Sequence, residues 1–173
     1  MHKRKRFLGL MAVLLLQAHV DSVSALPSTN TESGPAVTSK MVCAAEGQKE
    51  IAKALHMKPI RLVTPTWKNH LYSCRYVYAT GTIGVSVKEL ADESASINYF
   101  NSLVKKRGKR APFSGIGDAG FVTTDGSAVV RKDTSVLLVD VAKLPKKFGA
   151  PQRDPVVAAQ AVAGALVDCW THG

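Results

Sequence analysis

The stretch of this sequence that most resembles a known chemical motif is GIGDAG, residues 115–120. Letter for letter it fits G-x-G-x-x-G, the turn whose glycines let the backbone approach the pyrophosphate of a dinucleotide. In dinucleotide-binding proteins this turn follows a buried strand and opens a helix, whose N-terminus faces the phosphate. A cofactor is therefore expected only if the flanking residues have that order.

The residues around this turn do not have that order. KRAPFS precedes it without an apolar strand run, and FVTTDGSAVV, residues 121–130, follows it. The Asp125-Gly126 pair between two apolar runs predicts a hairpin there and not a helix. The glycines are explained by backbone conformation, since they permit positive φ, and Asp118 is expected to accept hydrogen bonds from nearby backbone N–H groups. The sequence therefore predicts neither a dinucleotide nor any other cofactor.

The side chains that could ligate a metal are few and widely spaced: Cys43, Cys74, Cys169, His56, His70 and His172. His70 and Cys74 lie in a predicted strand, where four residues span about 13 Å, too far for both to bind one zinc ion. The spacings C-x-x-C and H-x-x-x-H do not occur. The sequence therefore predicts no metal site.

An enzyme would need a nucleophile or an acid–base pair. The motifs G-x-S-x-G and H-E-x-x-H are both absent from the sequence. The aspartates with a predicted structural role at turns and helix caps are Asp92, Asp118, Asp125, Asp133 and Asp154. His56 and His70 have no partner in the sequence that would make either of them a base. We therefore expect a protein that is not an enzyme.

The whole chain carries a formal net charge of +10, and its basic residues are clustered. KKRGKR holds five basic residues in six, and residues 143–153 hold four more. Such clusters favour a partner of opposite sign: an anionic cell-wall polymer, a membrane surface or an acidic protein. The alternative is a helix end followed by a solvated loop, because cations near a helix C-terminus offset its dipole. The predicted anionic-partner surface, called the basic cluster below, consists of Lys105, Lys106, Arg107, Lys109 and Arg110.

Nucleic acid is not an expected partner. The basic runs lack interleaved aromatic side chains on which bases could stack. Export from the cell, which the N-terminus predicts, also separates the protein from most nucleic acid. An anionic partner of another class is therefore favoured.

Three helices are expected among the elements that hold these residues. The first covers about residues 45–56, with Ile51 and Leu55 on one face. The second runs from a cap at Asp92 to Gly108, and its predicted apolar stripe is Ile97, Phe100 and Val104. The last begins at Asp154-Pro155, and its predicted apolar stripe is Ala159, Val162, Ala163, Leu166 and Trp170.

Strand patterns occupy most of the remaining chain. LYSCRYVYA and IGVSV alternate around a tight connection, which predicts a hairpin with one buried and one wetter face, and Gly84 and Ser86 fall on the wetter face. The two arms of the 125–126 hairpin follow, and then SVLLVDV, whose near-continuous apolar character predicts a central strand. Hairpins imply antiparallel pairing. The predicted fold class is α+β: a single twisted, mainly antiparallel sheet with helices packed on one face.

The first 25 residues have the layout of a secretory signal peptide. Four basic residues precede an apolar run at residues 7–16, and Val23-Ser24-Ala25 offers short side chains for cleavage before Leu26. The run is shorter than the roughly 20 apolar residues of a spanning helix, so an uncleaved anchor is the lesser alternative. We therefore expect a secreted or cell-surface protein.

The rest of the chain divides into two parts. Residues 26–40 are rich in Ser, Thr and Pro and are predicted to be a disordered tether. Residues 41–173 are predicted to form a single α+β domain. In an oxidising compartment two of the three cysteines are expected to pair. The third is either buried and inert or available to another chain.

Several of these features occur together in one family. Cys43 ahead of a helix, Cys74 followed by Tyr76, the G-[IL]-G-D-A turn at 115–119, paired strands and a closing amphipathic helix resemble the uncharacterised family of small exported domains, mostly lipoproteins, of high-GC Gram-positive bacteria. The resemblance implies a Cys43–Cys74 disulfide and an α+β sheet fold, with no activity to carry over. This chain differs in lacking a lipid-modified cysteine and in having Cys169.

The function that we expect from the sequence is a secreted or cell-surface, non-enzymatic binding module that contacts anionic envelope material. One alternative is an inhibitor of a secreted enzyme, acting through an exposed rigid loop such as residues 143–153. A further alternative is an extracellular enzyme. The identity of the ligand does not follow from the sequence.

Overall fold

The computed structural model describes residues 34–172, with side chains as far as Cys169. The predicted signal peptide, residues 1–25, lies outside the described residues, and so does most of the predicted tether. The elements of the described chain, in order, are α1 Val37–Met41, α2 Ala45–Leu55, β1 Arg61–Lys68, β2 Leu71–Tyr78, β3 Gly81–Glu89, α3 Glu93–Arg107, β4 Ala111–Pro112, β5 Ala119–Val122, β6 Ala128–Lys132, β7 Ser135–Lys143 and α4 Pro155–His172.

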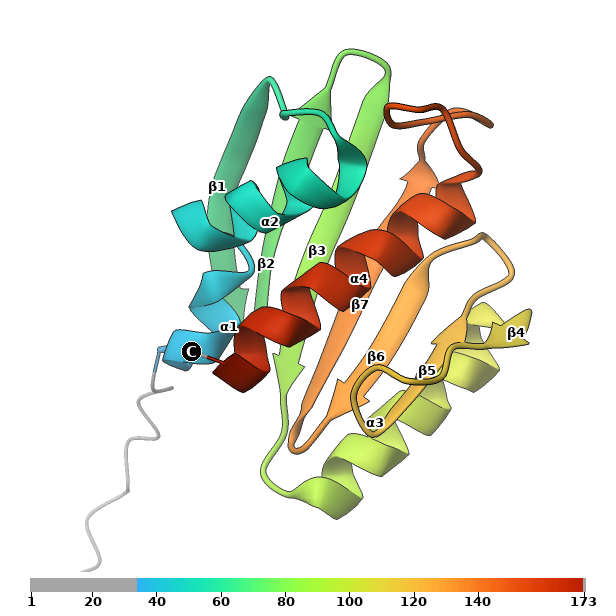
Figure 1. The fold of residues 1–173 in the computed structure, drawn as a ribbon. Helices are drawn as coiled ribbons and strands as arrows, with labels where there is room; N and C mark the ends of the chain where they lie inside the picture. The colour runs from blue at the N-terminus through green and yellow to red at the C-terminus, as the bar shows by residue number, and fades with distance from the viewer. Residues whose placement is uncertain (1–33, 173) are drawn as a thin grey trace, which may run out of the picture. The chain divides into compact units, whose positions relative to one another are not determined.

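The strands form one open antiparallel sheet of seven strands in the order β1-β2-β3-β7-β6-β5-β4 (Figure 1). This confirms the α+β fold class. The long strands β3 and β7 pair at the centre, and the segment between them forms α3 and the strands β4–β6, which continue the sheet beyond β7. Among the described helices, none is long and apolar enough to cross a lipid bilayer.

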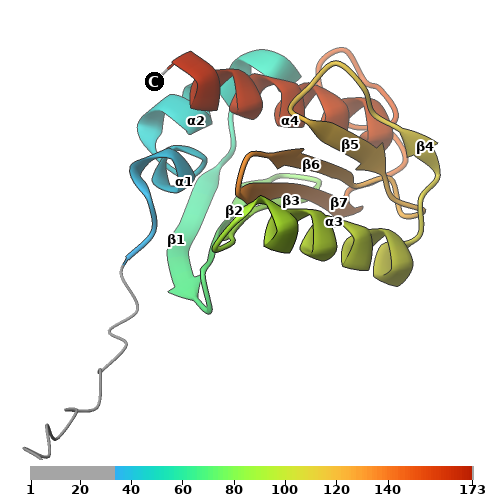
Figure 2. The ribbon, with the colours of Figure 1, turned by 90° about the horizontal axis from the view of Figure 1, so that it is seen from below.

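Helices cover both faces of the sheet, but unequally. Helices α2 and α4 pack against each other over one face, where α4 contacts β6 and β7, and α3 lies against the other face (Figure 2). The expectation that helices pack on one face therefore holds for α2 and α4, and α3 is the exception. The cause lies in β7, where Leu137 and Val139 point into the core under α4 while Val136 packs in a second core under α3.

The buried residues of the hairpin are those that the alternation predicts. Tyr76 in β2 and Ile83, Val85 and Val87 in β3 are at most 1% exposed. The predicted helices are also present, and Ile51 and Leu55 of α2 are completely buried. The wetter face of the hairpin, which carries Gly84, is partly exposed.

Helix α3 begins and ends as the sequence predicts, and Phe100 and Val104 of its predicted stripe pack in the second core, but Ile97 does not. Asp92 caps its N-terminus by accepting a hydrogen bond from the Ala95 amide at 2.7 Å, which stabilises a helix by about 1 kcal/mol. Ile97 is 39% exposed, whereas Ser96 and Leu103 are buried. Ser96 takes the inward position because its hydroxyl donates to two backbone carbonyls, one of them in the turn between β6 and β7.

The packed chain begins earlier than the predicted boundary at residue 41. Helix α1 covers residues 37–41, contacts α2 and α4, and buries Ser39, which is 1% exposed. The last residues of the predicted tether, 37–40, are therefore helical. Directly after α1, the Val42 carbonyl accepts a hydrogen bond of 2.5 Å from the buried Tyr76 hydroxyl, which fixes this segment against β2.

Candidate functional site

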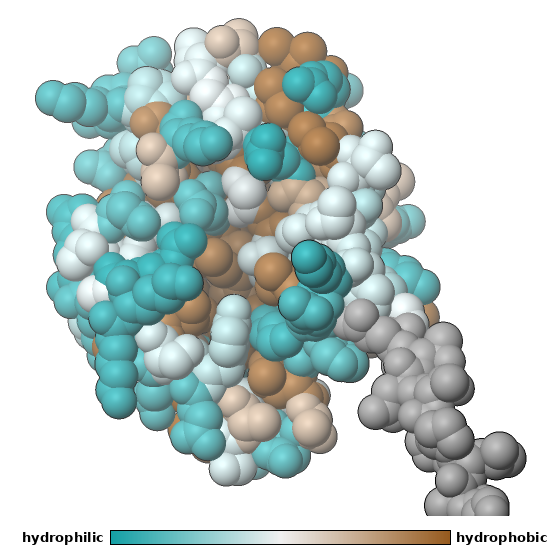
Figure 3. All heavy atoms as spheres, turned by 180° about the vertical axis from the view of Figure 1, so that it is seen from behind, coloured by the Kyte–Doolittle hydropathy of each residue, from teal (hydrophilic) through white to brown (hydrophobic). Residues whose placement is uncertain are grey.

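The face of the sheet opposite α4 is only partly covered. Helix α3 contacts β6 and β7 there and leaves the same face of β1, β2 and β3 open. Figure 3 shows this side of the molecule, hollowed near its centre between hydrophilic side chains. The hollow is a groove of about 350 Å³ lined by residues of β1, β2, β3 and β7.

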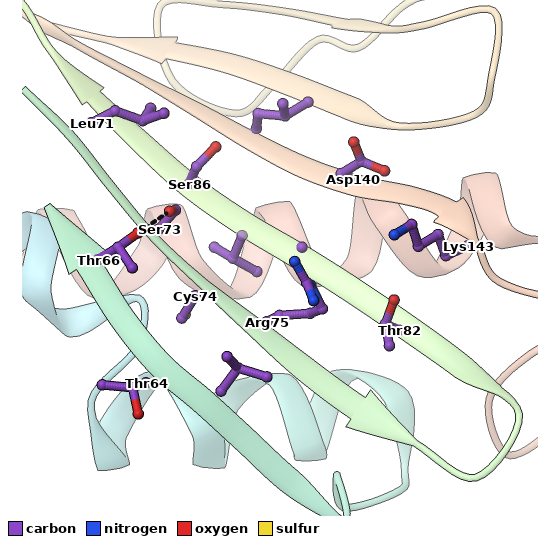
Figure 4. Close-up of a pocket in the computed structure, with 14 residues that line it drawn as sticks. Thr64, Thr66, Leu71, Ser73, Cys74, Arg75, Thr82, Ser86, Asp140 and Lys143 are labelled. Carbon is purple, nitrogen blue, oxygen red and sulfur yellow. Dashed lines mark hydrogen bonds between the residues drawn. The ribbon is translucent and has the colours of Figure 1, made fainter. Parts of the chain in front are cut away.

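The strand register defines the chemistry of this groove. Arg75 on β2, Gly84 on β3 and Asp140 on β7 lie in one row across the sheet. The next row holds Thr66, Ser73, Ser86 and Leu138, and the row on the other side of Gly84 holds Thr82 and Lys143. Figure 4 shows Arg75 and Asp140 on the two strands that flank β3. The groove therefore presents one carboxylate, two cations and several hydroxyl groups around a glycine, together with the apolar side chains of Val63, Leu71 and Leu138.

Neither a short contact nor a positive φ requires a glycine at Gly84, which borders an irregularity in the β3–β7 register between Thr82 and Gly84. A Cβ atom at this position would lie 3.4 Å from the Cβ of Asp140, which is an ordinary van der Waals distance, and its φ is not in the left-handed region. Gly81 on the same strand is different, because a Cβ there would lie 2.6 Å from the Lys143 carbonyl oxygen. A glycine within a strand weakens the sheet and often marks a bulge or a place where a ligand or another backbone approaches closely.

The basic cluster is joined to the groove through Arg107. Its guanidinium donates to a carboxylate oxygen of Asp140, which lines the groove, at 3.1 Å, and to Asp125 at 3.4 Å. Asp125 also accepts hydrogen bonds from Thr123 and Ser127. Burial alone would raise the pKa of Asp125, but these hydrogen bonds and the nearby Arg107 charge outweigh burial and lower it. The C-terminal end of α3 is thus held against β7 and the β5–β6 turn by ion pairs.

The other four members of the basic cluster have a different environment. Lys105, Lys106, Lys109 and Arg110 are exposed, and none of them forms an ion pair with another residue of the described chain. The structure therefore divides the five residues into one that fixes α3 and four free surface cations. The sequence KKRGKR alone does not distinguish the residue that forms ion pairs from the four that are exposed cations.

The second basic segment is divided in a similar way. Lys143 lines the groove, while Lys146 and Lys147 are exposed on the loop between β7 and α4. This loop is firmly held: Phe148 is buried against the Tyr78 ring at a centroid distance of 5.0 Å, and the backbones of Phe148 and Arg153 exchange two hydrogen bonds of 2.9 Å. The expected exposed loop is therefore present, with an anchored base.

The Cys43–Cys74 disulfide is present, with a Cα–Cα distance of 6.0 Å. It is consistent with an oxidising, extracellular location. Cys169 is a free, partly exposed thiol. Burial, together with the negative charges of Glu50, Asp168 and Glu46, raises the pKa of this thiol, which disfavours its reactive thiolate form. Within residues 34–169, no group of three or more His, Cys, Asp or Glu side chains could hold a metal ion.

The GIGDAG segment forms a turn that leads into β5 and not into a helix. Gly117 has a φ of +62°, and a Cβ atom there would lie 2.5 Å from the Arg131 carbonyl oxygen, so this position requires glycine. The Asp118 carboxylate accepts a hydrogen bond from the Asp133 amide at 2.7 Å and pairs with the buried Arg131 at 3.2 Å. The segment therefore holds the β6–β7 turn in place, which accounts for its residues without a dinucleotide.

One motif that the sequence interpretation missed is S-x-x-K at Ser102–Lys105, a spacing found in some serine hydrolases. In the structure both residues are exposed on the outer side of α3. The Ser102 hydroxyl donates to the Tyr99 carbonyl at 2.6 Å, within its own helix. Neither residue lines the groove.

The groove itself also escaped prediction as a site. In the sequence, the more polar face of the β2–β3 hairpin is the one feature that indicates this surface. The pairing of β3 with β7 brings Asp140 and Lys143 beside that face, and this pairing does not follow from local patterns. Comparison with models of known protein families, with curated proteins and with solved structures finds no match for this chain.

Proposed function

We propose that this protein is an exported, non-enzymatic binding module that contacts anionic envelope material through the basic cluster. The observation that carries the proposal is the set of four exposed, unpaired cations at the C-terminal end of α3: Lys105, Lys106, Lys109 and Arg110. Arg107, paired with Asp140 and Asp125, holds that end of the helix rigidly on the sheet. A fixed array of cations attracts an anionic polymer or surface without prior ordering of the protein.

Export is the second part of the proposal. The basic head, the apolar run and Val23-Ser24-Ala25 support cleavage of a signal peptide, and a disulfide is typical of exported proteins. Membership of the family of small exported domains of high-GC Gram-positive bacteria is likewise proposed on the resemblance of the residues alone.

The proposal predicts a charge-dependent association that can be measured by co-sedimentation with anionic vesicles or with insoluble wall material. Lys105, Lys106, Lys109 and Arg110 are replaced by Gln, and Arg107 is retained because it supports the fold. Each cation near an anionic surface contributes about 1 kcal/mol, so we expect the bound fraction at low salt to fall at least about tenfold. The wild-type association should also decrease steeply with salt, since exposed charges are screened over about 8 Å at physiological ionic strength.

A variant with the same change in net charge is the matched control. Four exposed cations lie on α2, on β1 and in the segment between them, away from the end of α3: Lys49, Lys53, Lys58 and Arg61. Their replacement by Gln should leave most of the association in place. Equal loss in both variants would show that net charge alone acts, and equal sedimentation of the cluster variant and the wild type would refute the proposal.

The anchored loop between β7 and α4 favours a second candidate function, inhibition of a secreted enzyme. Inhibitors present an exposed segment on a rigid base, and here Phe148 and Arg153 provide the base while residues 150–152 are exposed or half-buried. The Ala150 amide also donates to the Leu55 carbonyl at 3.1 Å, which ties the loop to the end of α2. An inhibitor would contact its enzyme through this loop and not through α3.

A further inference from the structure

We propose that the groove on the open face of the sheet is a binding site for a sugar unit that carries a single carboxylate, such as a uronic acid. This site is separate from the basic cluster, and its ligand is small, whereas the proposed partner of the cluster is a polymer or a surface. The groove volume of about 350 Å³ is at the low end of the range of roughly 300–1,000 Å³ for small-molecule sites.

The shape of the groove depends on Gly84. It lies in the middle of β3, a central strand, and no steric contact or positive φ excludes a side chain there. A strand interior normally favours a β-branched residue, because such side chains pack on the pleated surface and stabilise the sheet. The missing side chain instead leaves space between Arg75 and Asp140, its two neighbours across the sheet. We infer that this space is kept for a ligand.

One side of the groove is suited to a carboxylate. Arg75 points from β2 toward β3 (Figure 4), and its guanidinium makes no ion pair or side-chain hydrogen bond with the described part of the chain. A guanidinium presents a planar fork of donors that matches a carboxylate in two-bond geometry. The hydroxyls of Ser86 and Thr82, on either side of Gly84 along β3, add donors within the same depression.

The opposite side of the groove is suited to hydroxyl groups. The Asp140 carboxylate receives Arg107 on one oxygen at 3.1 Å and the Ala142 amide on the other at 3.1 Å. Each carboxylate oxygen can accept a further hydrogen bond, so Asp140 is able to receive sugar hydroxyls while Arg107 compensates its charge. A ligand with one negative group and adjacent hydroxyls is therefore the best match.

Neutral sugars match this groove less well. Sites for neutral sugars commonly place an aromatic ring under the sugar, and the residues that line this groove within the described chain include no aromatic side chain. Recognition must then come from Arg75, Asp140 and the hydroxyls, with Lys143 at the end of the groove. This is why the carboxylate is an essential part of the proposed ligand.

The test is a titration of the ¹⁵N-labelled protein with D-glucuronate, followed by NMR, with D-glucose and D-glucose 6-phosphate in parallel. Glucuronate should shift the amide signals of Gly84 and Ser86 in a saturable manner, and each of the other two compounds should bind at least tenfold more weakly. Absence of saturable shifts with glucuronate would overturn the site. Equally tight binding of the sugar phosphate would overturn the assignment of the carboxylate.

Variants separate a ligand site from a structural role. Gly84→Val fills the groove and Arg75→Gln removes the guanidinium, and each should weaken glucuronate binding at least tenfold. Gly84→Ala, which fits without a short contact, serves if the valine variant does not fold; it should weaken binding while melting at the same temperature as wild type or higher. Arg61→Gln, an exposed cation outside the groove, is the matched control. Unchanged binding in the Gly84 and Arg75 variants would refute the proposal.

The outcome is independent of the proposed function. The variant with four Gln in the basic cluster keeps Arg75, Gly84 and Asp140, so it should bind glucuronate as wild type does. Loss of sedimentation without loss of glucuronate binding would therefore separate the two sites. Loss of glucuronate binding in the cluster variant would show that the groove is not a site of its own.

Discussion

Removal of the Cys43–Cys74 disulfide is expected to lower the free energy of unfolding by about 3 to 4 kcal/mol. The bond closes a loop with a sequence separation of 31 residues, and in the chain-entropy model a loop of this size restricts the unfolded chain by that amount. Both cysteines are buried, at 4% and 8% exposure, so their replacement also disturbs the packing of Val42 and Tyr76 nearby. The segment that joins α1 to α2 should then detach first.

The measurement is urea denaturation of the Cys43→Ser/Cys74→Ser double variant against the wild type. Cys169→Ser is the control, since this thiol is partly exposed and unpaired; its change should stay within about 0.5 kcal/mol. A double variant that loses less than about 1 kcal/mol would mean that the disulfide adds little to a fold that is already held by its core.

Asp118→Asn is expected to lower the free energy of unfolding by about 1.5 to 3 kcal/mol. The Arg131 side chain is 10% exposed and pairs with Asp118 at 3.2 Å; its other ion-pair partner in the described chain, Glu93, is 71% exposed and lies at 3.6 Å. A buried charge that loses its partner costs about 3 to 5 kcal/mol. The cost here should be smaller, because Glu93 remains and Asp118 itself is 32% exposed.

Asp133→Asn provides the same chemical change in the same turn. Its carboxylate is 76% exposed and pairs only with Lys132 among the described residues, and asparagine tolerates its left-handed φ of 51°. Its effect should stay within about 0.5 kcal/mol. The free energy of unfolding of both variants is measured by thermal or urea unfolding. Equal values for the two variants would contradict a role for Asp118 in holding Arg131.

The local patterns of this sequence predict much of the fold. The alternation in β2 and β3 indicates which side chains are buried, and the continuous apolar run of β7 predicts a central strand. That run also explains the placement of α3, because a strand that is apolar on both sides needs a cover on each face. The apolar run predicts the central position of β7, and the cover on its second face follows from the same run.

Features that depend on pairing between distant segments could not be predicted in the same way. Strand β1 was missed because Pro65 and a bulge between Val63 and Thr66 interrupt its alternation, although proline is compatible with the edge position that β1 occupies. The groove combines four strands whose register is set by the whole sheet. Arg107 reads as one of five equal charges in KKRGKR, and only the position of Asp140 distinguishes it from its neighbours.

Hydrogen–deuterium exchange of the mature protein, with and without anionic wall polymer, tests the central claim most directly. The claim is that the C-terminal end of α3 and the segment after it form the contact surface. Four cations without an ion pair in the described chain gather there, two on the last turn of α3 and two just after it, and Arg107 fixes the helix to the sheet. The account predicts slower exchange at residues 105–112 when the polymer is bound, with the effect lost at high salt. Slower exchange confined to residues 146–152, or no change anywhere in the protein, would contradict it.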